Sequence, residues 1–327
     1  MKKIQVLVAA LTALTGSVTV VPAAVAQTYP TRAIRVIVPF APGGSTDIIA
    51  RLVTQRMSQE LGQPVVVENK AGAGGAIGAA EGARAAPDGY TLSVATVSTM
   101  AVLPACRPKD LPYNPIKDFA PVTNFANTAN VISVNPKFPA KDFKGFVEEL
   151  KKNPGKYSYG SSGTCSVLHL FGEAFKMATG TDIVHVPYKG AGPALADAVG
   201  GQVEILFDNL PSSMNQIQAG KLRALAVAWP KRIDNLKDVP TLAEVGYPQL
   251  NQPVWYGLLA PAGTPKEIIT KLRDAVVVAL KDPNVVKILE EQGSLASGNT
   301  PEEFAAEIKA QYDWAKDVVV KQKIELN

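Results

Sequence analysis

A short β-branched segment, a glycine-rich loop and an amphipathic helix follow one another repeatedly in this chain, and this order constrains its fold more than any other feature. Residues 34–39 have the pattern of a strand, and after a glycine loop residues 48–61 space their apolar side chains as a helix does. The order returns with the glycine tract 72–78 and the strand pattern at 90–95. Strands that alternate with helices predict an α/β fold with a mainly parallel sheet and helices on both faces.

The alternation is interrupted near the middle of the chain, where two extended runs, 120–126 and 130–135, stand next to each other. A new series of strands and helices begins with the helix pattern at 143–152, and the extended run 254–260 leads back. About 300 residues are also more than one hydrophobic core usually supports. We therefore predict two lobes joined by two hinge crossings that let them close over a ligand. Lobe one is expected to comprise 27–124 and 254–327, and lobe two 125–253.

Two helices near the C-terminus carry the same start signal. Thr264 and Thr300 are each followed by proline and, three positions on, by glutamate. This pattern predicts a threonine N-cap with a capping box and proline at the first helical position. The last helix mixes apolar and charged residues, and we expect its apolar face to pack on lobe one.

The first 26 residues have the features of a signal peptide. Two lysines precede the apolar run 4–21, and Ala24 and Ala26 provide the small residues of a cleavage site. A membrane anchor is the alternative, but polar residues interrupt the run and a cleavage signature, rather than a charged stop, follows it. We predict cleavage before Gln27, release into the periplasm and no membrane insertion of the mature chain.

Charge and motifs argue against nucleic-acid binding and against catalysis. The formal charge of +4 falls to +2 without the two leader lysines, which leaves no basic excess for nucleic acid. The segment 160–164 has threonine where a nucleophile elbow needs its final glycine, and the tract 72–78 lacks the third glycine of a dinucleotide-binding loop. His169 and His185 are the only histidines, and we expect packing roles for both. We therefore predict no enzyme, no cofactor and no metal site.

Cys106 and Cys165 are the only cysteines, in a chain expected to fold under oxidising conditions. We favour a disulfide between them, which would constrain the unfolded chain by up to about 4 kcal/mol. Two alternatives remain open for Cys165 and His169, which stand one helical turn apart: a nucleophile with its base, or a pair of metal ligands.

Three loops at the carboxyl ends of predicted strands are rich in small polar residues: 40–47, 96–99 and 160–166. Ligands of open α/β sheets bind at such strand ends. Each loop runs toward a helix, whose first N–H groups lack partners and whose dipole is positive there, so a carboxylate can be held without lysine or arginine. Alternatively, the glycines only permit turns and the hydroxyls only cap helices. Asp208, at the end of another predicted strand, could accept hydrogen bonds from a ligand ammonium group or orient the amides that contact the ligand.

Eight ordered motifs carry a family resemblance. They are Tyr29-Pro30, Pro39-Phe40-Ala41-Pro42-Gly43-Gly44 with Asp47, Glu68-Asn69, Pro87-Asp88-Gly89-Tyr90, Leu111-Pro112-Tyr113 with Asp118-Phe119, Gly160-Ser161-Ser162-Gly163, Val186-Pro187-Tyr188-Lys189-Gly190, and Phe207-Asp208-Asn209. In this order they resemble the Bug-type receptors of tripartite tricarboxylate transporters, over essentially the whole mature chain. The stretch 97–100 and Cys165 depart from the commonest forms of that family.

The resemblance implies a periplasmic binding protein type II fold and a monomeric receptor that captures a small carboxylate, for uptake by a transporter permease or for sensing. The expected ligand is an acidic amino acid such as glutamate or aspartate, or a di- or tricarboxylate; a hydrolase or lyase that uses Ser162 or Cys165 is the alternative function. The loops and the resemblance together predict a ligand site of Phe40, Ala41, Gly44, Ser45, Thr46, Asp47, Ser98, Thr99, Ser161, Ser162, Thr164, Ser166, Tyr188 and Asp208.

Overall fold

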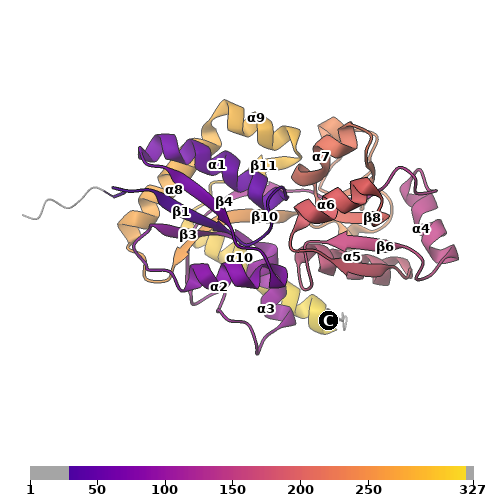
Figure 1. Ribbon diagram of the computed structural model, residues 1–327, viewed down its shortest axis with the longest axis horizontal. Helices are drawn as coiled ribbons and strands as arrows, with labels where there is room; N and C mark the ends of the chain where they lie inside the picture. The colour runs from indigo at the N-terminus through magenta and orange to yellow at the C-terminus, as the bar shows by residue number, and fades with distance from the viewer. Residues whose placement is uncertain (1–28, 322–327) are drawn as a thin grey trace, which may run out of the picture.

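The computed structural model describes residues 29–321, so the predicted signal peptide at 1–26 lies outside the described residues. The described chain forms two β-sheets, each covered by helices, which lie side by side along the long axis of the molecule (Figure 1). We call the six-stranded sheet with its helices lobe one, and the five-stranded sheet with its helices lobe two. The predicted α/β fold of two lobes is confirmed.

Lobe one has a mixed sheet. Its strands, in spatial order, are β11 (Ser294–Ala296), β4 (Phe119–Thr128), β10 (Val254–Pro261), β3 (Thr91–Thr96), β1 (Ile34–Val38) and β2 (Val65–Asn69). Strands β1, β2 and β3 are parallel, and β10 runs antiparallel to β3 and β4. The helices around it are α1 (Ser45–Leu61), α2 (Ala76–Ala83), α3 (Leu103–Cys106), α8 (Lys266–Lys281), α9 (Pro283–Glu291) and α10 (Pro301–Lys321). Apolar side chains of β1 are buried on both faces, as the predicted parallel arrangement requires.

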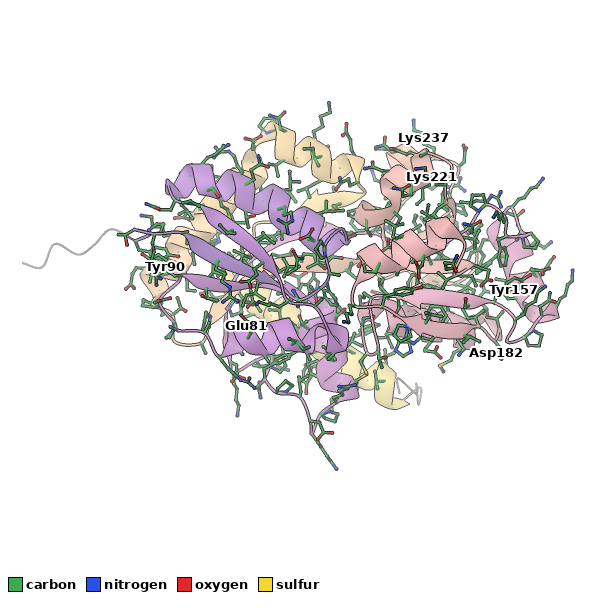
Figure 2. The ribbon with its side chains drawn as sticks, in the orientation of Figure 1. Glu81, Tyr90, Tyr157, Asp182, Lys221 and Lys237 are labelled. Carbon is green, nitrogen blue, oxygen red and sulfur yellow. A yellow bond between two sulfur atoms is a disulfide. The ribbon has the colours of Figure 1, made fainter. Side chains whose placement is uncertain are left out.

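Lobe two is smaller and its core is richer in aromatic rings. Its strands, in spatial order, are β7 (Val184–Pro187), β6 (Ser158–Ser161), β8 (Ile205–Asn209), β5 (Asn130–Val134) and β9 (Arg223–Ala228). Its helices are α4 (Phe143–Lys152), α5 (Val167–Thr179), α6 (Ala191–Gly200) and α7 (Leu210–Gln218). Phe143, Phe146 and Phe175 pack on one another in its core, which is separate from the core of lobe one. Tyr90 of lobe one and Tyr157 of lobe two mark the opposite outer ends of the molecule (Figure 2).

The chain crosses between the lobes twice. Strand β4 ends at Thr128 and β5 begins at Asn130, so only the buried Ala129 separates a strand of one sheet from a strand of the other. The return path runs from β9 to the start of β10 at Val254. Lobe boundaries near 124 and 254, in the sense of bodies that move separately, stay a prediction.

The two threonine-proline signals have different outcomes. The Glu303 N–H donates to Thr300 Oγ1 at 3.2 Å and the Thr300 N–H donates to Glu303 Oε2 at 2.8 Å, which confirms the predicted capping box of α10. The prediction for Thr264 is wrong, because α8 begins at Lys266 with Pro265 as its N-cap. The buried Thr264 hydroxyl donates instead to the Pro261 carbonyl at 2.8 Å, so the turn that follows β10 uses the group that would have capped the helix.

Helix α10 packs against β4 and α3, as expected for a helix of lobe one. Within residues 29–321 no helix is both long and apolar enough to cross a membrane.

Candidate functional site

The three predicted loops meet between the lobes, where they enclose a small cavity of about 20 Å³. Of the predicted ligand residues, six line this cavity: Phe40, Gly44, Ser45, Thr46, Ser98 and Ser162. Within residues 29–321, no lysine, arginine, histidine or carboxylate side chain lines it. The cavity has room for little more than one water molecule, so the lobes are closed on each other in this structure.

The glycine loop of lobe one is braced by Asp47. Its carboxylate accepts hydrogen bonds from the Gly43 N–H at 3.1 Å, from Asn69 Nδ2 at 2.9 Å and from Arg51 Nε at 2.9 Å. Burial alone would raise the pKa of this carboxyl, but the three donors outweigh it and hold the pKa below its usual value. Asp47 is therefore ionised at neutral pH and fixes the loop from behind, while Ser45 and Thr46 present the first turn of α1 to the cavity.

The loop and the start of α1 also contact lobe two directly. Ser45 Oγ donates to the Asn209 carbonyl at 2.8 Å and accepts from the Ser212 N–H at 3.0 Å. The Ala41 N–H donates to the Lys189 carbonyl at 3.1 Å. Where Gly192 meets the Pro42 carbonyl, a Cβ on Gly192 would lie 2.2 Å from that oxygen, so only glycine permits this approach of the two backbones. These contacts hold the lobes in the closed arrangement.

The lobe-two loop is held by hydroxyls and neutral imidazoles. Ser161 Oγ is 2.6 Å from His185 Nε2 and accepts from the Gly163 N–H at 3.1 Å, and Ser166 Oγ caps α5 by accepting from the His169 N–H at 3.2 Å. The rings of His169 and His185 stack with centroids 3.7 Å apart. Burial lowers the pKa of His169 to about 4 and that of His185 to about 3, so both rings are neutral at pH 7. The expected packing roles of both histidines fit this arrangement.

A disulfide joins Cys106, the last residue of α3 in lobe one, to Cys165 in the loop between β6 and α5 of lobe two, with Cα atoms 6.2 Å apart. It confirms the favoured prediction and removes the two alternatives, since a disulfide sulfur is neither a free thiol nucleophile nor a metal ligand. No group of three or more potential metal-binding side chains occurs in the described part of the chain. The serine that contacts a histidine is the fully buried Ser161, not Ser162.

The other predicted site residues lie beside the cavity rather than in its wall. Thr99 bonds with Thr96 Oγ1 at the end of β3, and the Tyr188 hydroxyl donates to Asp197 at 2.7 Å on α6. The Thr164 carbonyl faces Gly74 of lobe one, where a Cβ on that glycine would lie 2.4 Å from it. With Asp47, Ser161 and Ser166, these side chains shape the loops that form the site.

Asp208 is completely buried at the end of β8. Its carboxylate accepts from Ser212 Oγ at 2.6 Å, from Ser213 Oγ at 2.8 Å and from the Asn209 N–H at 2.8 Å, all within lobe two. Burial raises the pKa of Asp208 to about 7, although the three donors oppose this shift. A direct contact of Asp208 with a ligand ammonium group stays a prediction, and this geometry gives it no support.

Sequence reasoning missed several residues of the cavity wall. Asn209 lines the cavity, whereas its neighbour Asp208 does not. The Asn209 amide oxygen accepts a hydrogen bond from the Tyr256 hydroxyl at 2.7 Å. Trp255 and Tyr256 belong to the run 254–260, which the sequence pattern predicts only as a hinge crossing. An aromatic pair at the start of a hinge strand, next to the cleft that the hinge serves, is a signal that could have identified them. The remaining wall residues are Thr96, Val97, Val167, Ala191 and Val254.

Comparisons with known proteins agree with this architecture. The model of the tripartite tricarboxylate transporter family receptor matches residues 49–322. Protein BugT of Bordetella pertussis is 38% identical over 278 residues, which cover 85% of each chain. The structure of a periplasmic transporter is 82% identical and covers 91% of this chain and 100% of its own, with a TM-score of 0.91. MatC from Rhodopseudomonas palustris with bound malate is 36% identical, with a TM-score of 0.85, over 89% of this chain and 100% of its own.

The family match covers most of both lobes and two of the three cleft loops, 96–99 and 160–166, and it begins just after the loop 40–47. It explains why the closed cleft offers hydrogen-bond donors from two lobes but no group poised for proton transfer, as expected of a protein that holds a solute unchanged. The chain belongs to the tripartite tricarboxylate transporter receptor family, as a Bug-type solute-binding receptor and not an enzyme.

Proposed function

We propose that this receptor captures a small di- or tricarboxylate in the periplasm. The observation that carries the proposal is the cavity between the lobes, which is formed by the first turn of α1 and by hydroxyl, amide and aromatic side chains from both lobes. Thr46 and Ser162 line the cavity with hydroxyl groups, which are neutral donors, and the helix terminus adds a favourable potential for an anion. The malate bound to MatC, a relative over the whole length of that chain, supports the same ligand class.

A plain carboxylic acid fits the site better than an acidic amino acid. An α-ammonium group in a closed, water-poor cleft needs an acceptor, preferably a carboxylate. Two acidic residues adjoin wall residues in the chain, Asp208 and Asp47. The oxygens of Asp208 are occupied by Ser212, Ser213 and the Asn209 N–H, and those of Asp47 by the Gly43 N–H, Asn69 and Arg51. An acidic amino acid is therefore the less favoured of the two ligand classes that the sequence predicts.

The cleft must open to admit such a ligand, because a four-carbon dicarboxylate does not fit in about 20 Å³. The two crossings at Ala129 and before Val254 provide the hinge. We further propose that the mature receptor is a monomer that passes its ligand to a transporter permease, in line with the family match.

A calorimetric titration tests the proposal. The mature chain is unfolded, dialysed and refolded to remove any co-purified ligand, and then titrated with malate, citrate, adipate, glutamate and aspartate. We expect saturable binding of at least one di- or tricarboxylate, and a rise in thermal stability of about 2.7 kcal/mol at a hundredfold excess over Kd.

Two variants make the titration specific to the site. Thr46→Val removes a hydroxyl from the cavity wall with little change in volume, and we expect weaker binding. Thr31→Val makes the same change at an exposed position far from the cavity and serves as the matched control. The proposal is wrong if no carboxylate binds the refolded chain, or if both variants bind like the wild type.

A further inference from the structure

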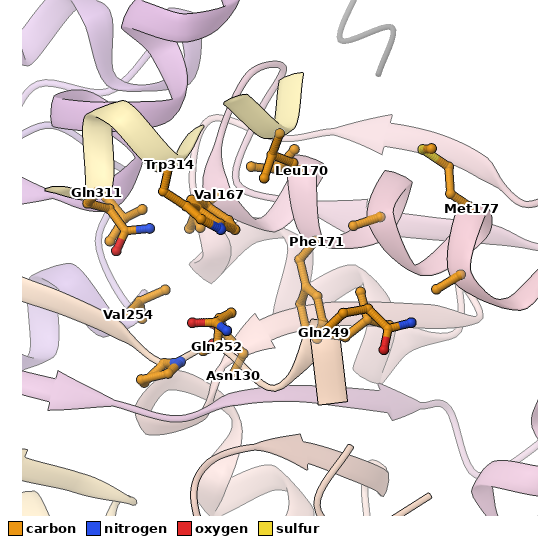
Figure 3. Close-up of a pocket in the computed structure, with 16 residues that line it drawn as sticks. Asn130, Val167, Leu170, Phe171, Met177, Gln249, Gln252, Val254, Gln311 and Trp314 are labelled. Carbon is orange, nitrogen blue, oxygen red and sulfur yellow. The ribbon is translucent and has the colours of Figure 1, made fainter. Parts of the chain in front are cut away.

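A second and much larger cavity, of about 560 Å³, lies between the lobes (Figure 3). One wall is the face of α5 that carries Leu170, Phe171 and Met177, and the opposite wall is the end of α10 with Gln311 and Trp314. The return segment from lobe two to β10, including Gln252, closes its base. Cavities of this volume commonly hold small molecules.

The chemistry of the lining is that of a site for a neutral, mainly apolar molecule. Among the residues that the structure describes, no charged side chain lines the cavity, and its polar side-chain groups are the amides of Asn130, Gln249, Gln252 and Gln311 and the indole N–H of Trp314. Met177 and Trp314 are 51% and 37% exposed, which is unusual for large apolar side chains that converge on one hollow. An aromatic ring with one hydroxyl would bury its apolar faces there and bond to an amide, whereas a carboxylate would lose its hydration without a cationic partner.

The two cavities share a wall. Val97 of lobe one, Val167 of lobe two and Val254 at the hinge line both of them. A hydrogen bond from the Val167 N–H to Ser98 Oγ, 2.9 Å long, joins the lobes at this wall, and Cys165 of the interlobe disulfide is two residues from Val167. A wall that is tied to both lobes and lies between two interlobe cavities acts as a pivot. A rotation about this wall that opened the small polar cleft would narrow the large apolar cavity, and the reverse.

We propose that the cavity between α5 and α10 is a second binding site, for a neutral aromatic molecule, and that its occupation favours the closed state of the carboxylate cleft. A ligand wedged between Phe171 and Trp314 keeps these two walls apart, which is the arrangement that accompanies the closed cleft here. Only the coupling between the sites rests on the proposed carboxylate function; binding in the cavity does not. Because coupling is reciprocal, a carboxylate must raise the affinity of the second site by the same factor.

Tryptophan emission can locate the probe 4-bromobenzyl alcohol, since bromine quenches an indole that it contacts. Trp314 lines the large cavity and Trp255 the small one. We expect saturable quenching in the wild type and in Trp255→Phe, and loss of quenching in Trp314→Phe. Quenching that survives in Trp314→Phe but not in Trp255→Phe places the probe in the carboxylate cleft and overturns the proposal, as does the absence of any saturable quenching.

The coupling is measured by titrating malate, or the carboxylate found to bind best, with and without saturating probe. We expect the Kd of the carboxylate to fall about fivefold or more with the probe present. An unchanged Kd, or a Kd that rises in proportion to probe concentration, overturns the coupling. If no carboxylate binds at all, the proposed function fails, while the quenching titration still decides whether the second site exists.

Ala174→Phe gives an independent check, because its side chain is placed in the cavity and acts as a permanent wedge. We expect this variant to lose the probe and to bind the carboxylate about fivefold more tightly without it. Ala305→Phe, on the exposed face of α10, is the matched control and should change neither affinity. Ala174→Phe with wild-type carboxylate affinity and normal thermal unfolding contradicts the wedge.

Discussion

The lobes meet in two places that are built differently. On one side of the cleft the contact is non-covalent: the Ala41 N–H bonds to the Lys189 carbonyl, Gly192 lies against the Pro42 carbonyl, and the Ser45 hydroxyl bonds to Asn209 and Ser212. On the other side the Cys106–Cys165 disulfide ties α3 to the loop before α5. The first contact can separate without breaking a covalent bond and the second cannot. Opening is therefore expected at the glycine contact, with the disulfide close to the pivot.

This difference explains how a receptor of this kind can be cross-linked between its lobes and still admit a ligand. A disulfide far from the rotation axis would lock the cleft, whereas one next to the shared wall at Val97 and Val167 restricts sliding more than rotation. Four predictions test this comparison, beginning with the largest expected effect.

Removal of the disulfide tests the side of the interface where the lobes are covalently joined. The double variant Cys106→Ser, Cys165→Ser opens a covalent loop between residues that are 59 positions apart. We expect the free energy of unfolding, measured with urea, to fall by about 4 kcal/mol, because the unfolded chain gains the entropy that the loop withheld. Faster release of bound carboxylate should accompany the loss. A variant as stable as the wild type would show that the disulfide is no brace between the lobes.

The Asp208 carboxyl tests the non-covalent contact between the lobes. It accepts a hydrogen bond from the Ser212 hydroxyl, and the Ser212 N–H bonds to Ser45 of lobe one. Its pKa of about 7 in the folded state is above that of an unfolded aspartate, so the folded state binds the proton more tightly. The stabilisation that this proton provides is present below about pH 4 and is lost as pH rises toward 7.

Asp208→Asn cannot titrate, so the difference in unfolding free energy between wild type and variant isolates this group from the two buried histidines. Between pH 4 and pH 7.5, we expect the unfolding free energy of the wild type to fall by roughly 2–4 kcal/mol relative to that of the variant. Parallel curves for the two proteins would mean that the carboxyl titrates normally.

A methyl group at Gly192 tests closure at the glycine contact. In the closed state its Cβ would lie 2.2 Å from the Pro42 carbonyl oxygen, a contact that separation of the lobes at this side would relieve. We expect Gly192→Ala to raise the Kd of the carboxylate at least tenfold, about 1.4 kcal/mol, with unchanged thermal stability of the unliganded protein. Gly200→Ala, in the same helix and with open space around it, is the control and should bind normally.

Sequence reasoning succeeded where function depends on backbone and failed where it depends on burial. The pattern of strand, glycine loop and helix at 34–61 predicts α1 and its N-terminus, and Ser45 and Thr46 line the cavity in the structure. The sequence also paired Cys106 with Cys165 correctly. It could not show that Asp47 turns away from the cavity to bond Arg51 and Asn69, because that depends on which face of α1 meets β2.

The hinge illustrates a second limit. The run at 254–260 was identified as a crossing from its hydrophobic pattern, and β10 confirms the strand. That Val254, Trp255 and Tyr256 also form a wall of the cleft follows from the angle between the lobes, which no local pattern encodes. The large cavity has the same origin, since α5 and α10 belong to different lobes and the angle between the lobes sets how far apart their apolar faces lie.

The smallest expected effect concerns the hydrogen bond beside the disulfide. Ser98→Ala removes the acceptor of the Val167 N–H, and we expect a loss of about 1 kcal/mol in unfolding free energy. Ser133→Ala, at a buried serine whose hydroxyl has no hydrogen-bond partner among the described residues, should be close to neutral. If the disulfide holds Val167 in reach of Ser98, the cost of Ser98→Ala must shrink in the variant that lacks both cysteines, because the loop is then free to move away. If Ser98→Ala lowers the unfolding free energy equally in the two backgrounds, the hydrogen bond and the disulfide act independently. The covalently joined side of the interface would then consist of two separate contacts rather than one pivot.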